Sequence, residues 1–149
     1  MSDTTETRIV EASRVIAAPA DVIFEQIADP AKQPAWDGND NLGAAPEGQR
    51  VRATGEVFSM TLTKGAVREN HVVEFEEGRR IAWKPAEEGK PPIGQLWRWE
   101  LEPEGAGTRV THTYDWSELQ DESRLERARN TKPANLLASI DRLAGLLEA

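Results

Sequence analysis

Apolar and polar residues alternate along much of the chain, and the alternation is clearest between residues 96 and 102. There Trp97, Trp99 and Leu101 occupy every second position, with arginine and glutamate between them. A period of two is typical of a β-strand that has one buried face and one face in water. The same pattern predicts further strands over residues 50–63, 67–76, 79–84 and 110–116.

A first strand is predicted over residues 8–16, where β-branched and polar positions are mixed and the inward face stays ambiguous. The connections between the later strands are short, as in the glycine-rich turn at residues 103–107. Short connections favour hairpins, so strands that are adjacent in sequence are expected to pair antiparallel. Residues 37–48 have the composition of a loop.

Two short helices are predicted between the first strand and this loop. Pro19 is expected at the first helical position, and five apolar residues then share one helical face. Asp29 and Pro30 end that helix and provide an N-cap and a first-turn proline for the second helix, which Pro34 closes. The shared apolar face consists of Ala20, Ile23, Phe24, Ile27 and Ala28.

Near the end of the chain the period of two gives way to helical spacing. A helix is predicted from about Lys132 to Glu148, with Pro133 in its first turn. At 1.5 Å per residue it would be roughly 25 Å long, which is enough to cross a sheet face. Residues 121–129 are highly charged and are predicted to form a weak helix or a loop. The apolar stripe of the long helix comprises Leu136, Leu137, Ile140, Leu143, Ala144 and Leu147.

These elements predict an α+β fold, in which an antiparallel sheet of about six to seven strands packs its helices on one face. The face of the sheet expected to point inwards is rich in tryptophan, which rarely fills a close-packed core and whose N–H needs a partner. Such a surface suits a cavity for a small hydrophobic or aromatic molecule, and the alternative is a solid core against the helix. The candidate ligand-binding residues are Trp36, Phe58, Met60, His71, Trp83, Trp97, Trp99, His112, Tyr114, Trp116, Leu136 and Ile140.

Composition narrows the classes of protein to consider. The 149 residues are typical of one domain, and the absence of cysteine excludes disulfides and fits the reducing cytoplasm. The net charge of −8 repels a phosphate backbone, so nucleic acid is not an expected partner. Residues 1–8 are polar, unlike a secretory signal, and no apolar run approaches the ~20 residues of a membrane span.

The chain has two histidines, His71 and His112, and the alternation assigns both to the inward face. In residues 67–76 it places Val73 and Phe75 on the same face as His71, and Asn70 on the opposite face. The two histidines could contact a ligand, act as a general acid or base, or be buried with ordinary hydrogen bonds. A metal site needs at least a third ligand, and Glu56 is the only acidic residue near those faces. We therefore expect neither a metal ion nor a cofactor.

The loop after the short helices carries two further features. Asp37, Asn39 and Asn41 have the spacing that opens a calcium-binding loop, but the glycine and the glutamate that such a loop requires are missing. A solvated turn is therefore predicted there. Trp36, at the start of this loop, is expected either to contact a ligand as part of a lid or to anchor the loop.

Six segments spread over nearly the whole chain carry a family resemblance through their order. They are residues 12–24, 29–36, 78–83, 97–101, 107–112 and 139–143. Together they resemble the START/Bet v 1-like (SRPBCC) superfamily, and most closely its polyketide cyclase/dehydrase-like branch. The resemblance implies that residues 1–149 form one domain with a helix-grip fold, in which a curved sheet wraps around the last helix and leaves a ligand cavity between them.

The same resemblance implies diverse functions, and three hypotheses stay open. The first is a protein that binds a small hydrophobic or aromatic molecule without chemistry of its own. The second is a cyclase or aromatase for a polyketide-type substrate, with His71, His112, Tyr114 and Arg98 as candidates, although Arg98 alternates to the outside. The third is an interaction module similar to activators of chaperone ATPases. An exposed sheet edge allows a monomer or a homodimer.

Overall fold

The computed structural model describes residues 7–148, so most of the polar N-terminal stretch lies outside the described part. A seven-stranded antiparallel sheet has the strand order β1-β7-β6-β5-β4-β3-β2. The strands are β1 (Ile9–Ile16), β2 (Leu42–Ala44), β3 (Val57–Leu62), β4 (Val67–Glu76), β5 (Arg80–Glu87), β6 (Leu96–Glu104) and β7 (Gly107–Asp115). The helical elements are α1 (Ala20–Ala28), the 3-10 turn η1 (Pro30–Lys32), α2 (Gln33–Trp36), α3 (Glu122–Arg129) and α4 (Pro133–Leu147).

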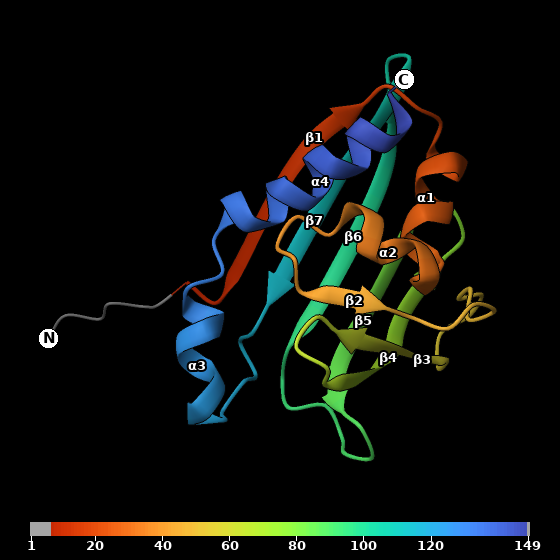
Figure 1. The fold of residues 1–149 in the computed structure, drawn as a ribbon. Coiled ribbons are helices and arrows are strands. Elements are labelled where there is room, and N and C mark those ends of the chain that lie inside the picture. The colour runs from red at the N-terminus through yellow and green to blue at the C-terminus, as the bar shows by residue number, and fades with distance from the viewer. Residues whose placement is uncertain (1–6, 149) are drawn as a thin grey trace, which may run out of the picture.

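The sheet curls around one side of α4, and this arrangement confirms the predicted α+β helix-grip fold. Figure 1 shows α4 running diagonally across the sheet, with α1 and α2 beside it on the same face. Helix α4 packs on β1 and β7 and touches α2. Every strand from β2 to β7 pairs antiparallel with its neighbour in sequence, and β1 closes against β7. The short connections predicted these pairings from β3 onwards. Within residues 7–148, no helix is both long and apolar enough to cross a membrane.

The two helical segments after β1 form for the reasons that the sequence indicated, with small shifts at their ends. Ile23, Phe24 and Ile27 are fully buried on one face of α1. The carboxylate of Asp29 accepts a hydrogen bond from the backbone N–H of Ala31 at 3.2 Å, which is the predicted N-cap. Pro34 does not close the second segment, because it lies in the first turn of α2, where its missing N–H leaves no hydrogen bond unmade.

Other element boundaries also differ from the prediction. The third strand begins at Val57 instead of residue 50, and residues 42–44, predicted as loop, form β2 by pairing with β3. A three-residue strand is too short to show an alternation, so its pattern could not be recognised. The charged segment at residues 121–129 forms the regular helix α3, whose start is capped by the carboxylate of Asp121 on the N–H of Ser123 at 3.0 Å.

A β-bulge in β4 overturns the predicted inward positions of His71 and Val73. The pairing with β5 shifts between Val72 and Glu74, so that one extra residue is inserted into β4. Before the bulge Asn70 and Val72 point inwards and are buried, whereas Val73 is 38% exposed. After the bulge the alternation is restored in the predicted phase, and the ring of Phe75 packs against that of Phe24.

The loop that follows α2 passes so close to α4 that only glycine fits at position 38. A Cβ atom on Gly38 would lie 2.5 Å from the carbonyl carbon of Ala138 and 2.7 Å from the backbone nitrogen of Ser139. The backbone N–H of Gly38 also donates a hydrogen bond to the Ser139 hydroxyl at 3.0 Å. The loop is thereby fixed directly on the helix.

We predict that Gly38→Ala destabilises the protein by about 1–3 kcal/mol, because two backbones would have to move apart. Gly145→Ala is the matched control, because Gly145 lies in α4 with nothing within 4 Å of its added Cβ. That substitution should stabilise the helix by about 0.5–1 kcal/mol. Urea unfolding of both variants measures the difference, and equal stabilities would contradict the close approach.

Candidate ligand-binding pocket

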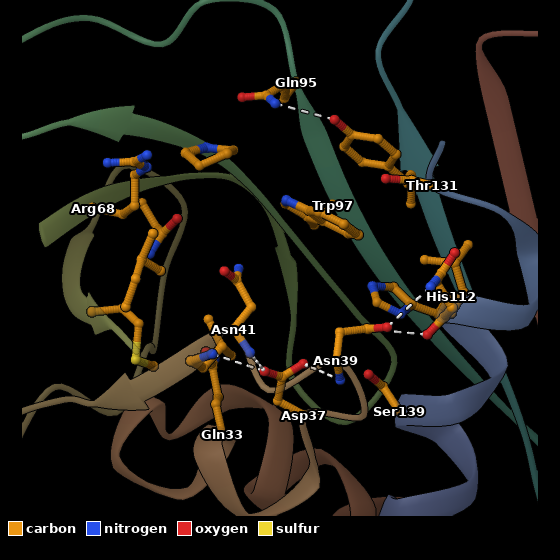
Figure 2. A pocket seen from close by; sticks show the side chains of 18 of the residues that line it. Gln33, Asp37, Asn39, Asn41, Arg68, Gln95, Trp97, His112, Thr131 and Ser139 are labelled. Carbon is orange, nitrogen blue, oxygen red and sulfur yellow. Dashed lines mark hydrogen bonds between the residues drawn. The ribbon is translucent and has the colours of Figure 1, made fainter. Parts of the chain in front are cut away.

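A pocket of about 360 Å³ lies between the sheet, the loop after α2, and the two C-terminal helices. Strands β4 to β7 form its floor, and residues of α3, α4 and the segment between them form one wall. Figure 2 shows Arg68 on one side of this pocket and His112 and Ser139 on the other, with Trp97 between them. The lining residues are Gln33, Trp36, Asp37, Asn39, Asn41, Leu42, Met60, Leu62, Arg68, Asn70, Trp83, Pro85, Gln95, Trp97, Trp99, His112, Tyr114, Arg124, Arg127, Asn130, Thr131, Asn135, Leu136 and Ser139.

The floor of the pocket is a stack of aromatic rings from β6 and β7. Antiparallel pairing places Trp97 opposite Tyr114 and Trp99 opposite His112. The Trp97 and Tyr114 rings stack with centroids 4.1 Å apart, and the Trp99 and His112 rings stack at 3.7 Å. Trp97 also contacts His112 at 5.5 Å, so the four rings form one continuous surface. Such a surface is matched by a flat apolar molecule.

His112 is buried, with 6% of its surface exposed, and carries two ring nitrogens that lack partners within the described residues. Within the described residues, nothing hydrogen-bonds to Nδ1 or Nε2 of His112, or to Nε1 of Trp99 beside it. Burial lowers the pKa of His112 from 6.5 to about 3, so the imidazole is neutral at physiological pH. A neutral imidazole has one donor and one acceptor, and a ligand with a carbonyl or hydroxyl group could satisfy them.

Trp36 forms the closed end of the pocket and also anchors its own segment. Its indole N–H donates a hydrogen bond to the carbonyl oxygen of Gln26 at 2.8 Å, which ties α2 to α1. Its ring meets that of Trp99 edge-on with centroids 5.1 Å apart. Trp36 is only 3% exposed, so it serves as a wall of the pocket and not as a movable lid.

The loop after Trp36 is held by the carboxylate of Asp37, which points into its own backbone. This carboxylate accepts hydrogen bonds from the N–H groups of Asn39, Asn41 and Leu42 at 3.2, 2.7 and 2.8 Å. The Asn39 side chain then exchanges two hydrogen bonds of 3.2 Å with Asn135 at the start of α4. Within residues 7–148, no three acidic or histidine side chains gather closely enough to hold a metal ion.

The end of the pocket toward α3 is polar and positively charged. Arg68 of β4 and Arg124 and Arg127 of α3 line it, and the amide of Gln95 donates to the Tyr114 hydroxyl at 3.1 Å. Burial raises the pKa of Tyr114, so its phenol stays protonated. The pocket therefore has an aromatic end at His112 and a cationic end at Arg68.

Eight of the twelve residues predicted from the sequence line this pocket, and the other four lie elsewhere. Phe58 is buried behind Trp83, against which its ring packs edge-on at 5.2 Å. Ile140 is buried in the core between α4 and the sheet. Trp116 does not line the pocket but belongs to a second apolar cluster that includes the lining residues Tyr114 and Leu136. His71 lies on the outer face of β4 because of the bulge. The eight lining residues are Trp36, Met60, Trp83, Trp97, Trp99, His112, Tyr114 and Leu136.

The sequence reasoning missed most of the polar residues of the pocket. Arg68 was assigned no role and Asn70 an outward position, because the bulge changes which face of β4 points inwards. Arg124 and Arg127 lie three residues apart on α3, and that spacing places both on one helix face. The spacing was available in the sequence, but the segment had not been assigned as a definite helix.

The curled sheet, the long helix across it and the pocket between them define the helix-grip class of proteins. Residues 7–148 match the family model described as polyketide cyclase / dehydrase and lipid transport. Because the match covers nearly the whole chain, the chain belongs to this family. None of the curated proteins compared with the sequence matches it.

Solved structures share the fold at low sequence identity. MLL2253 from Mesorhizobium loti is 19% identical, with a TM-score of 0.71 over 95% of this chain and 97% of that one. The Aha1 dimer from Colwellia psychrerythraea is 18% identical, with a TM-score of 0.65 over 95% and 97% of the two chains. DynU16, a protein of the dynemicin biosynthetic locus, is 21% identical, with a TM-score of 0.67 over 96% of this chain and 48% of its own. These similarities show the fold alone.

The neutral state of His112 predicts a dependence of stability on pH. Below about pH 6.5 the unfolded chain binds a proton at His112 and the folded chain does not, so the free energy of unfolding falls as the pH falls. The slope should approach about 1.4 kcal/mol per pH unit. Denaturant unfolding between about pH 6.5 and pH 5, above the range in which most carboxylates titrate, measures it.

The variant His112→Phe keeps an aromatic ring in the stack and removes the titrating group. We expect its unfolding free energy to vary less with pH over this range than that of the wild type. An equally steep slope in the variant would mean that His112 is not the group responsible.

Proposed function

We propose that the protein binds a small, flat, largely apolar molecule in the pocket over β4 to β7. The observation that supports this proposal most directly is the lining itself. Aromatic rings of Trp36, Trp97 and Trp99 surround a space of about 360 Å³, and buried polar atoms of Trp99 and His112 lack protein partners there. A solid core would fill such a space and would pair those atoms.

The family to which the chain belongs supports the same proposal. Its description joins cyclisation and dehydration of polyketides with lipid transport, and all of these activities require an apolar molecule to be held by the protein. A volume of about 360 Å³ lies at the lower end of the range typical of small-molecule sites. It favours a molecule of two to four rings over a long-chain lipid.

A cyclase or aromatase reaction is the alternative within the family. A general base works best when its pKa lies near the operating pH, whereas burial lowers that of His112 to about 3. The protonated phenol of Tyr114 can donate a hydrogen bond to a ligand carbonyl, but it is a poor base at neutral pH. The pocket therefore supports binding more strongly than proton transfer, and we rank catalysis second.

The chaperone-activator hypothesis rests on a similar fold only. Aha1 shares the architecture at 18% identity, which carries no information on partners of this chain. The wall of the pocket formed by α3 and α4 explains the charged segment at residues 121–129 without invoking a partner protein. We therefore place this hypothesis last.

The binding proposal can be tested with N-phenyl-naphthylamine, an uncharged aromatic dye whose fluorescence rises in apolar surroundings. We expect saturable binding to the wild type and about ten-fold weaker binding to Trp97→Ala, because that ring forms the centre of the floor. Trp116→Phe is the matched control, since Trp116 is buried outside the pocket, and its affinity should equal that of the wild type. Absence of saturable binding to the wild type, or equal effects of the two substitutions, would contradict the proposal.

A further inference from the structure

Three arginines meet at the end of the pocket that faces α3. Arg68 extends from the first part of β4, and Arg124 and Arg127 reach the same end from one face of α3. Arg68 and Arg124, together with Gln95, also line a small adjoining hollow of about 30 Å³ that carries Lys90. The only carboxylate on the described lining of the main pocket is that of Asp37, and it is engaged by backbone N–H groups.

The three arginines differ in how far the protein itself compensates their charge. Arg124 forms an ion pair of 2.6 Å with Glu87, which in turn lies 3.1 Å from the ammonium group of Lys90. Arg127 donates to the amide oxygen of Asn41 at 3.1 Å and so interacts with a neutral group. Arg68 is half-buried, and no group within residues 7–148 accepts a hydrogen bond from its guanidinium or forms an ion pair with it.

The electrostatic surroundings of Arg68 agree with this geometry. Burial, followed by the repulsion from Arg124, lowers the pKa of Arg68, and the attraction of Glu87 only partly offsets these effects. The guanidinium nevertheless remains charged, because arginine does not lose its proton in proteins. A half-buried cation beside two others is unfavourable unless an anion is nearby.

Many of the other arginines that the structure describes are paired with carboxylates, as expected in a protein of net charge −8. Arg98 forms a two-pronged pair with Glu74 on the outer face of the sheet, and Arg50 bridges Glu25 and Glu77. Arg109 pairs with Glu104 in the same way. Acidic residues are therefore plentiful, yet Glu87, which lies opposite Arg68 in the β4–β5 register, is engaged by Arg124 and Lys90.

We propose that the molecule bound in this pocket is an organic acid, with its rings on the floor formed by Trp97 and Trp99 and its oxyanion on Arg68. This inference rests on the proposed binding function and specifies its ligand class. Arg124 and Arg127 add to the positive potential, and the planar guanidinium of Arg68 can donate two parallel hydrogen bonds to a carboxylate. The same chemistry would hold a sulfonate or a phosphate ester.

The register of the sheet sets the spacing between the two ends. Trp83 faces Trp97 across β5 and β6, and Arg68 faces Glu87, four residues further along β5. Four residues of a strand span roughly 13 Å. The side chain of Arg68 covers part of this distance, and a ligand body of two or three rings spans the rest. The ligand is thus an amphipathic acid with its charge at one end.

The test compares two dyes that differ by one sulfonate group. Anilinonaphthalene sulfonate is the acidic counterpart of N-phenyl-naphthylamine, so the pair isolates the contribution of the oxyanion. The wild type should bind the sulfonate at least about ten-fold more tightly than the uncharged dye, since a hydrogen bond between charged groups is worth roughly that factor or more. Arg68→Gln should remove this preference, lowering the affinity for the sulfonate about ten-fold and that for the uncharged dye much less.

Arg79→Gln is the matched control, because Arg79 is exposed in the turn before β5 and does not line the pocket. Like the wild type, it should keep the preference for the sulfonate. Thermal unfolding curves first show that all variants are folded. Equal affinities of the wild type for the two dyes would overturn the inference while leaving the binding proposal intact. So would an equal loss for both dyes in Arg68→Gln. Failure of both dyes to bind the wild type would instead remove the binding proposal itself.

Discussion

The pocket exists because one helix is too narrow to cover the face of this sheet. Seven strands at about 4.8 Å spacing make a sheet roughly 29 Å wide, whereas a helix with its side chains is about 10–12 Å across. Helix α4 lies over β1 and β7, and α1 contacts β6 on the same face (Figure 1). The side chains of Trp83 on β5 and Trp97 on β6 line the pocket beside these helices. These aromatic side chains therefore border a space instead of a packed core.

The contacts around this space hold its walls in place without closing it. The carboxylate of Asp37 folds the loop back on itself, and Gly38 lets that loop lie directly against α4. Trp36 fixes α2 to α1 through its indole N–H and presses its ring against Trp99. A pocket bounded by such short, specific contacts is largely preformed. Binding a rigid molecule in it would cost little conformational entropy, which favours recognition of shape.

The architecture and the aromatic half of the pocket could be predicted from the sequence, because both depend on short-range periodicity. The alternation of Trp97 and Trp99 identifies an inward face directly, and the spacing from Leu136 to Leu147 identifies the helix that packs beside it. The bulge at Val73 broke this logic. One inserted residue exchanges the two faces of a strand, so His71 was placed inside and Asn70 outside. Nothing in the local sequence of β4 marks a bulge, because its cause lies in the pairing with β5.

The cationic end was harder to predict for a different physical reason: it is assembled by contacts between distant segments. Strands β5, β6 and β7 lie between Arg68 and Arg124 in the sequence. The two residues meet only because α3 packs beside the pocket that β4 also lines. Charged residues on a short helix are usually interpreted as a solvated face, and composition alone showed only a surplus of acid. Carboxylates pair with arginines on the outside of the sheet, whereas Arg68, which forms no ion pair within residues 7–148, lines the pocket. A net negative protein can thus present a positive interior end. An acid approaching this molecule would be repelled by its surface as a whole and held only where its rings and its charge are both matched, which makes the pocket selective for the combination.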